Sequence, residues 1–364
     1  MEKTIKVVHL PTDIGMRAYS LSKAERELGL ESWDIVRRPG PHSSDSIKPL
    51  YSPNPFIYSW RLLKSFIKTL NVDVIMANSG SSLLDFGKFH LPLLDIPLYK
   101  KLGKRVIVTY QGCDIRLCEL CPVRISLPAH EICPIVMNSY KEYDRIKLKR
   151  FKIWLQYADY IFGITPDLCH LEGILYTPHA KYIETSSIIS NAVAKDAKQK
   201  VRIAYFARKK IMERIRNIEF LKGTQYIEET LEKLILDFPN KFECVPIADL
   251  PWDHALKLLY TCDILVDQIV FGWYGGMSVE AALLGVIPVA YIDSKLLSFI
   301  PEDMRNDLPV LALESKEHLY PVLQKLIFNR EIIIEESIRC RKSAMKFHEA
   351  RVVASKMIKD YYKK

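Results

Sequence analysis

Short runs rich in valine and isoleucine alternate with amphipathic helical patterns along the chain, in two successive blocks. The helical patterns include Met16–Leu28, Pro55–Leu70 and Thr224–Asp237. The predicted strands are Ile5–Leu10, Trp33–Val36, Val72–Ala77, Arg105–Tyr110, Tyr160–Thr165, Val201–Phe206, Phe242–Ile247, Asp263–Asp267, Ile287–Ile292 and Pro309–Leu313. Strands that are apolar on both faces and separated by helices form parallel sheets with right-handed crossovers. Two such blocks predict an α/β protein with two Rossmann-like, doubly wound domains.

The chain has 364 residues, a length that suits two domains better than one. The polar stretch Ser190–Lys200 contains few bulky apolar residues, so we place the boundary there. The expected domains are residues 1–190 and 200–345. From Asn329 the sequence predicts helix, ending in an amphipathic segment through Tyr361.

The formal net charge is +9, from 52 lysines and arginines against 43 aspartates and glutamates. Such an excess attracts polyanions, anionic membrane surfaces or phosphorylated ligands. It gathers in Lys141–Lys152 and Arg339–Lys364, although solvated helix faces have the same composition. No zinc-finger, RNP or helix-turn-helix pattern accompanies the charge, so no nucleic-acid partner is expected.

Neither a membrane span nor a secretory signal is visible in the sequence. No window reaches the roughly 18 to 20 apolar residues of a span, and Met1–Leu10 lacks the apolar region and cleavage site of a signal. We therefore expect a cytoplasmic protein. Two basic stretches, Trp60–Lys68 and Lys141–Lys152, could rest on the anionic inner face of a membrane, or they could be plain surface helices.

A glycine-rich loop after the predicted strand ending at Asp267 is the most informative segment. It holds Gly272, Gly275 and Gly276 and leads into a helix that opens near Ser278. Free backbone N–H groups and the positive end of a helix dipole make such a loop a candidate anion site. Glu280 falls in the first helical turn, where its carboxylate could accept hydrogen bonds from sugar hydroxyls.

The residues around this loop carry a family resemblance. This segment resembles the nucleotide-sugar site of family 4 glycosyltransferases, which have the GT-B fold of two domains facing a cleft. The matching residues are Asp267-Gln268, Gly272-Trp273-Tyr274-Gly275, Glu280-Ala281 and Gly285…Pro288-Val289. The resemblance implies that Glu280 holds the ribose hydroxyls. It also implies that backbone amides of Gly275, Gly276, Met277 and Ser278 hold the distal phosphate and donor sugar. The family has another glutamate eight residues before this one, where this chain has Gly272.

Lys222-Gly223-Thr224 resembles the KGT that follows the first strand of the second domain in the same family. There a lysine and a nearby arginine neutralise the diphosphate as it becomes the leaving group, so Lys222 is the expected catalytic cation. Two cations suit this role because negative charge builds on the phosphate oxygens. Arg208 and Arg216 are the favoured partners, with Arg214 also open.

In the first domain, Gly15 follows the first strand, where a glycine permits close backbone approach to a donor phosphate or acceptor. Gln111 to Arg116 resembles a family arrangement whose first residue is a histidine close to the transferred sugar. This chain has Gln111 at that position, which can hydrogen-bond a hydroxyl but cannot take its proton. Asp114 and Arg116 match the family pattern, and Asp114 and Gln111 are candidate catalytic residues.

Four cysteines, Cys113, Cys118, Cys121 and Cys133, lie within 21 residues. They satisfy the ligand count of a structural zinc site, which would stabilise a long loop without taking part in chemistry. Unmetalled thiols and an iron–sulfur cluster are the alternatives. His130 lies in the same loop and could replace one cysteine.

The sequence thus predicts a glycosyltransferase that moves a sugar from a nucleoside-diphosphate sugar to a glycan or lipid-linked acceptor. By resemblance it would retain the anomeric configuration and need no catalytic metal, and residues 346–364 would form a terminal helix that packs on the first domain. The alternatives are a catalytically impaired binding protein whose cysteine loop is stabilised by a metal, and a sugar-nucleotide epimerase. A dehydrogenase is disfavoured because no G-x-G-x-x-G follows the first strand.

Overall fold

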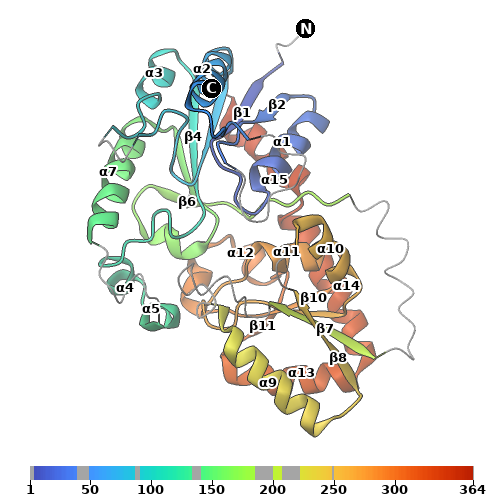
Figure 1. Ribbon diagram of the computed structural model, residues 1–364. Coiled ribbons are helices and arrows are strands. Elements are labelled where there is room, and N and C mark those ends of the chain that lie inside the picture. Colours follow the sequence, from blue (N-terminus) through green and yellow to red (C-terminus); the bar gives the residue numbers. More distant parts are fainter. Residues whose placement is uncertain are drawn as a thin grey trace. The chain divides into compact units, whose positions relative to one another are not determined.

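The computed structural model describes residues 4–38, 49–86, 91–132, 141–184, 200–206, 222–247 and 250–363 (Figure 1). The chain divides into two compact units. The first comprises Met1–Cys118, Tyr140–Tyr182 and Ala350–Lys364, and the second comprises Glu119–Ser139 and Ile183–Glu349. The segment 119–139, which the sequence led us to expect in the first domain, therefore groups with the second unit. The expected boundary at Ser190–Lys200 lies, apart from Lys200, outside the described residues.

The first unit is built on a parallel sheet of six strands in the order β2-β1-β3-β4-β5-β6. The strands are β1 Lys6–Leu10, β2 Glu31–Asp34, β3 Val74–Asn78, β4 Arg105–Tyr110, β5 Tyr160–Gly163 and β6 Ile174–Tyr176. Strand β2 begins two residues before the predicted Trp33, because the chain reverses at Gly29, in the left-handed region, and pairs with β1 from Glu31 onward. The short strand β6 was not predicted.

Helices cover both faces of this sheet. They are α1 Arg17–Glu27, α2 Pro55–Thr69, α3 Ile96–Lys101, α7 Lys141–Tyr157 and α15 Ala350–Met357, with a 3-10 turn at Pro166–His170 and a π-helical end at Ile358–Tyr362. One core joins Val7 and Met76 of the sheet to Leu21 of α1 and Val353 of α15, all of them buried. On the opposite face, Tyr110 of β4 meets Phe151 of α7 edge to face, with ring centroids 6.1 Å apart.

The C-terminal segment is attached to the first unit by a buried polar network. Tyr362 donates a hydrogen bond to Glu25 Oε1. Glu25 Oε2 lies 2.9 Å from His9 Nε2 and accepts a hydrogen bond from Ser32 Oγ at 2.6 Å. Burial alone would raise the pKa of Glu25, but His9 and these donors hold it below its ordinary value. The chain end is thus held by both apolar packing and satisfied hydrogen bonds.

The second unit contains a parallel sheet of five strands in the order β11-β10-β9-β7-β8. The strands are β7 Val201–Phe206, β8 Phe242–Ile247, β9 Ile264–Val266, β10 Ile287–Tyr291 and β11 Leu311–Leu313, at the predicted positions. The helices are α4 Cys121–Arg124, α5 Pro128–Ile132, α9 Thr224–Asp237, α10 Trp252–Tyr260, α11 Gly276–Leu283, α12 Glu302–Arg305, α13 Leu319–Phe328 and α14 Arg330–Phe347, with 3-10 turns at Ser294–Phe299 and Lys316–His318.

The helical tail predicted from Asn329 is two helices, because α14 ends at Phe347 and α15 begins at Ala350. This break coincides with the change from the second unit to the first. Within the described parts of the chain, no helix is long and apolar enough to cross a membrane.

Both sheets reverse their strand order at their first strand. In the first sheet, β2 lies on one side of β1, and β3 to β6 follow on the other side. In the second sheet, β8 lies on one side of β7, and β9 to β11 follow on the other side. In open parallel sheets, ligands bind beyond the carboxyl ends of the strands at such a switch point. The residues after β7 and β9, and after β1, β3 and β4, are therefore where a site is expected.

Candidate functional site

In the second unit, a cation and a carboxylate meet at the switch point. Asp267 follows β9 directly, and Lys222 precedes α9, the helix that follows β7. The Lys222 Nζ lies 3.3 Å from Asp267 Oδ1. The Asp267 side chain is fully buried, whereas that of Lys222 is 27% exposed. A backbone hydrogen bond from Ile269 N to Lys222 O, at 3.1 Å, joins the two loops.

The second oxygen of Asp267 fixes the glycine-rich loop. Asp267 Oδ2 accepts hydrogen bonds from Ser278 Oγ at 2.7 Å and from Gly275 N at 3.2 Å. A Cβ at position 275 would lie 2.5 Å from Gln268 Nε2 and 2.9 Å from Asp267 Oδ2, so these side chains would have to shift to admit it. The glycine therefore permits the close approach that lets one carboxylate tie β9 to the start of α11.

Helix α11 begins at Gly276, two residues before the predicted opening at Ser278. Gly275 occupies its N-cap position, and among the described residues no side-chain hydrogen bond caps it. Gly275, Gly276 and Met277 are half-buried, while Ser278 is buried. Unpaired first-turn N–H groups and the positive end of the helix dipole favour an anion. Together with Lys222 they give this edge of the sheet the chemistry of a phosphate site.

Glu280, the other predicted donor residue, lies inside the second unit. Its side chain is buried, and its Oε1 accepts a hydrogen bond from Trp252 Nε1 of α10 at 2.9 Å. The sequence did not point to Trp252, because its contact with Glu280 depends on how α10 packs beside α11. The same is true of His348, whose Nε2 lies 3.0 Å from the Tyr274 hydroxyl.

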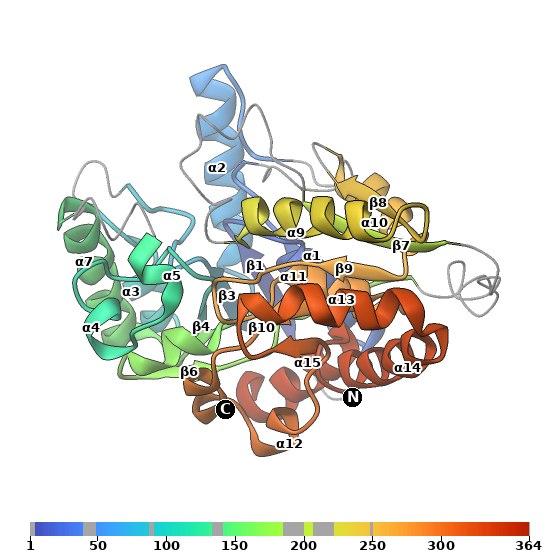
Figure 2. The ribbon, with the colours of Figure 1, turned by 90° about the horizontal axis from the view of Figure 1, so that it is seen from below.

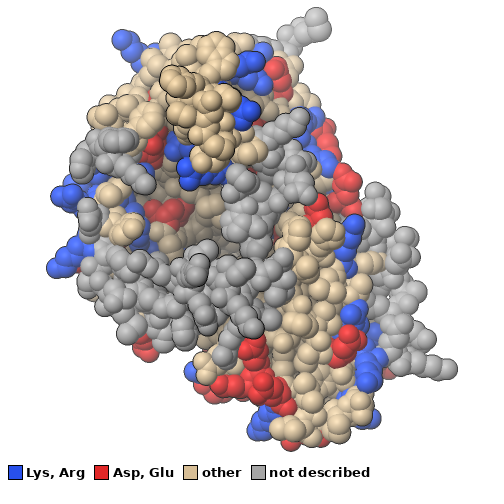
Figure 3. Space-filling model, viewed as in Figure 1, with Lys and Arg blue, Asp and Glu red and all other residues tan. Residues whose placement is uncertain are grey.

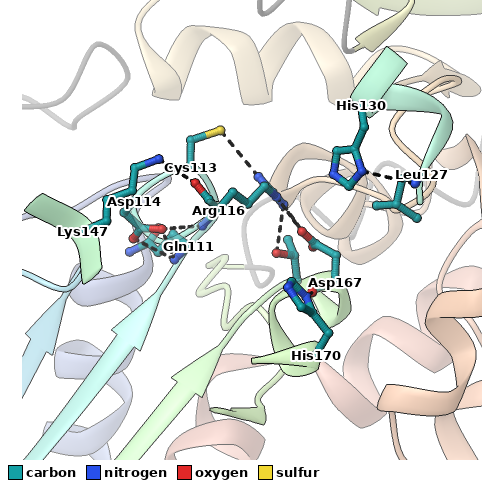
Figure 4. Close-up of polar contacts among 11 residues, drawn as sticks. Gln111, Cys113, Asp114, Arg116, Leu127, His130, Lys147, Asp167 and His170 are labelled. Carbon is teal, nitrogen blue, oxygen red and sulfur yellow. Dashed lines mark hydrogen bonds and ion pairs between the residues drawn. The ribbon is translucent and has the colours of Figure 1, made fainter. Parts of the chain in front are cut away.

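In the first unit, Asp114 organises the turn after β4 (Figure 4). Its carboxylate accepts hydrogen bonds from Gln111 N, at 2.9 Å to Oδ2, and from Gly112 N, at 2.8 Å to Oδ1. Burial raises the pKa of Asp114 although these two donors oppose the shift. The side-chain amide of Gln111 has no hydrogen-bond partner among the described residues. Gln111 thus brings an unsatisfied donor and acceptor to the carboxyl edge of β4.

Arg116, from the same motif, forms a bidentate ion pair with Asp167 (Figure 4). Its Nε and Nη2 donate to the two carboxylate oxygens at 2.5 and 3.0 Å, and Nη2 also donates to Thr165 Oγ1 at 3.1 Å. Burial alone would lower the pKa of Arg116, but the Asp167 carboxylate raises it above its ordinary value. The sequence missed Asp167, which lies 51 residues away. This pair fixes the loop after β4 to the loop after β5.

Gly15 lies in the left-handed region with φ of 60° and precedes α1. Lys181 Nζ donates a hydrogen bond to its carbonyl at 2.7 Å. Asp13 in the same loop accepts a hydrogen bond from Ala18 N in the first turn of α1 at 2.8 Å, while Met16 is the N-cap residue. Burial raises the pKa of Asp13 to about 6. The loop after β1 thus carries a glycine and a carboxylate with a raised pKa, and the buried Lys181 contacts it from a distant part of the chain.

The cysteine cluster is described only in part, because Cys133 lies outside the described residues. Cys118 and Cys121 are buried, and Cys113 is exposed with its Sγ 3.7 Å from Arg116 Nη1. Among the residues that the structure describes, no three His, Cys, Asp or Glu side chains are grouped so that they could hold a metal ion. The four-cysteine site stays a prediction. The arginines Arg208, Arg214 and Arg216 also lie outside the described residues.

No protein-family model matches the chain, and no curated protein does. Solved structures match it over nearly its whole length. The sucrose-phosphate synthase of Thermosynechococcus elongatus is 13% identical, covers 99% of this chain and 98% of its own, and superposes with a TM-score of 0.59. The chain has the GT-B fold.

Two further GT-B structures match with ligands bound. HepE from Anabaena, in complex with UDP-glucose, is 9% identical over 98% of this chain and 99% of its own, with a TM-score of 0.53. An α-glucosyltransferase in complex with UDP and a 13-mer DNA is 12% identical over 99% of this chain and 100% of its own, with a TM-score of 0.55. At these identities the likeness establishes the GT-B fold alone, so the chemistry has to be argued from this chain's residues.

Proposed function

We propose that this GT-B protein is a glycosyltransferase that takes a sugar from a nucleoside-diphosphate sugar and attaches it to a hydroxyl of a glycan or lipid-linked acceptor. The observation that carries the proposal is the position of Lys222 at the switch point of the second sheet. There it pairs with Asp267, whose other oxygen accepts from Gly275 N and Ser278 Oγ at the start of α11. A cation and a row of backbone N–H groups suit a diphosphate. UDP or UDP-glucose is bound by two of the structural relatives.

In the proposed reaction, the acceptor oxygen forms a bond to the anomeric carbon while the bond from that carbon to the β-phosphate oxygen breaks. The electron pair leaves with the nucleoside diphosphate, and the acceptor proton passes to a phosphate oxygen or to solvent. Lys222 stabilises the charge that builds on the leaving diphosphate, assisted by Arg208 or Arg216. The distal phosphate and the donor sugar are held by the backbone amides of Gly275, Gly276, Met277 and Ser278. The ribose hydroxyls are held by Glu280.

On the acceptor side, Gly15 allows close backbone approach, and Gln111 offers an amide to a sugar hydroxyl. Gln111 cannot act as a base, so its expected contribution is orientation. Asp114 supports this role by holding the turn on which Gln111 lies. We expect the anomeric configuration to be retained by resemblance alone, and in such a reaction the leaving phosphate can receive the proton.

The test is release of nucleoside diphosphate from a panel of UDP-, GDP- and ADP-sugars, with the anomeric configuration of the product read by NMR. We expect one donor class to be turned over by the wild type and not by Lys222→Ala or Glu280→Ala, with the fold of both variants intact. Binding of donors without release would instead indicate a binding protein, and binding of none would refute the proposal. Elemental analysis of the same preparation tests the predicted zinc.

A further inference from the structure

Helix α2, Pro55–Thr69, exposes large apolar side chains along one stripe. Phe56 is 84% exposed, Trp60 67%, Leu63 49% and Ile67 57%. Their spacing of four, three and four residues places them on one face of a helix. Of the fifteen residues of α2, only Leu62 and Thr69 are buried. A water-facing helix normally presents polar residues on this side, and contiguous exposed apolar surface marks an interaction site.

The charges of α2 are all positive and lie beside the apolar stripe. Arg61, Lys64 and Lys68 are exposed, and the helix contains no aspartate or glutamate. At about 100° per residue these cations form a second stripe next to the first, still on the exposed side of the helix. Figure 3 shows uncharged surface over α2 with lysine and arginine beside it. The exposed side of α2 is therefore half apolar and half cationic.

Side-chain contacts involve both ends of α2. Asn54 Oδ1 accepts hydrogen bonds from Phe56 N at 3.0 Å and Ile57 N at 3.3 Å, so Asn54 caps the N-terminus of α2. Lys68 Nζ lies 4.3 Å from the centroid of the Trp33 ring. Figure 2 shows α2 extending beyond strands β1 and β3 of its own unit.

We propose that α2 docks this protein on an anionic lipid surface, with Phe56, Trp60, Leu63 and Ile67 in the boundary between headgroups and acyl chains. A helix with aromatic and aliphatic residues on one stripe and lysine or arginine on the other suits that boundary. Three cations without a carboxylate select a negatively charged surface. This docking does not depend on the proposed sugar transfer, because it uses residues outside both sheet edges.

The second basic stretch does not share this geometry. It lies in α7, where Phe151 and Trp154 are buried against the first unit. The helix also carries Asp144, which is 3.6 Å from Lys147. The cations of α7 are thus partly neutralised and its largest apolar groups are internal, so α2 is the docking element.

The experiment is co-sedimentation of the full chain with vesicles of phosphatidylcholine alone or of phosphatidylcholine with phosphatidylglycerol. We expect binding to the anionic vesicles only, weakened by salt. The double variant Arg61→Gln/Lys64→Gln should lose about fivefold in partitioning for each cation removed. Phe56→Gln/Trp60→Gln should lose about tenfold or more, because two large apolar groups no longer enter the boundary. Circular dichroism should show that both variants are folded.

A matched control is Leu236→Gln on α9, whose side chain is 81% exposed but has no apolar stripe of this kind around it. Its partitioning should equal that of the wild type. Equal binding to neutral and anionic vesicles, or no effect of Phe56→Gln/Trp60→Gln, would overturn the proposal. So would light scattering that shows a dimer lost in the same variant, because the stripe would then bind a second copy of the chain.

Discussion

Replacing Lys222 with methionine separates the charge of this residue from its packing. Methionine preserves an unbranched apolar stem beside Phe206, whose ring centroid lies 3.9 Å from the lysine Nζ. The variant removes the cation that lies 3.3 Å from Asp267 Oδ1. Asp267 keeps its hydrogen bonds from Ser278 and Gly275, and the Lys222 side chain is already 27% exposed. We therefore expect a loss of only about 1 kcal/mol in the free energy of unfolding.

The effect on binding should be larger. A hydrogen bond from an ammonium to a phosphate contributes about 1.5–3 kcal/mol, and about 1.4 kcal/mol corresponds to tenfold in affinity. Isothermal titration calorimetry should therefore show that Lys222→Met weakens binding of the nucleoside diphosphate by about 10- to 150-fold. The nucleoside monophosphate, which lacks the second phosphate, should lose less. The preference for diphosphate over monophosphate should shrink accordingly.

The matched control is Lys233→Met, which removes a cation of the same helical region, 4.7 Å from the Tyr320 ring centroid. Its net charge change and its loss of a ring contact equal those of Lys222→Met. Both nucleotides should bind this variant as they bind the wild type. The reasoning is refuted if the two variants weaken the diphosphate equally, or if Lys222→Met leaves its affinity unchanged.

Three further predictions concern the loop, the chain end and the response to pH. Gly275→Ala should weaken donor binding by about tenfold or more, because its Cβ would approach Asp267 Oδ2 to 2.9 Å and displace the loop; unchanged calorimetric affinity would count against the assignment. Tyr362→Phe should lower the free energy of unfolding by about 1–2 kcal/mol in chemical denaturation, because Glu25 loses a donor, and a neutral effect would contradict this. Asp13, with its pKa raised to about 6 from 3.8, binds a proton more tightly in the folded state, so stability should fall by up to about 3 kcal/mol as the pH rises from 4 to 6. Asp13→Asn should lose this dependence, and parallel stability profiles for the two proteins would disprove it.

The fold could be predicted because its signals are local. Strand β9 is a continuous apolar run and β4 contains one at Val106–Val108, and glycines and helical patterns separate such runs. Strand β6 has only three residues, one of them exposed, so it gives no such pattern. The early start of β2 also escaped prediction, because it depends on pairing with β1 rather than on its own composition.

The candidate site could be predicted where one segment carried it, as with the glycine-rich loop and Lys222. The partners of those residues could not be predicted, because they come from distant parts of the chain. Trp252 reaches Glu280 across 28 residues, and Asp167 reaches Arg116 across 51. Periodicity and spacing report neighbours along an element. The first of these pairs depends instead on how α10 packs beside α11, and the second on how the loops after β4 and β5 converge.

Hydrogen–deuterium exchange with and without a nucleoside-diphosphate sugar tests the central claim most directly. If the switch point of the second sheet binds the donor, amides of the loop and first turn from Gly272 to Glu280 should become protected, together with those around Lys222. The amino end of the same sheet, around Asp263, should be unchanged. Protection confined to other parts of the chain, or no change with a donor shown to bind, would contradict the account.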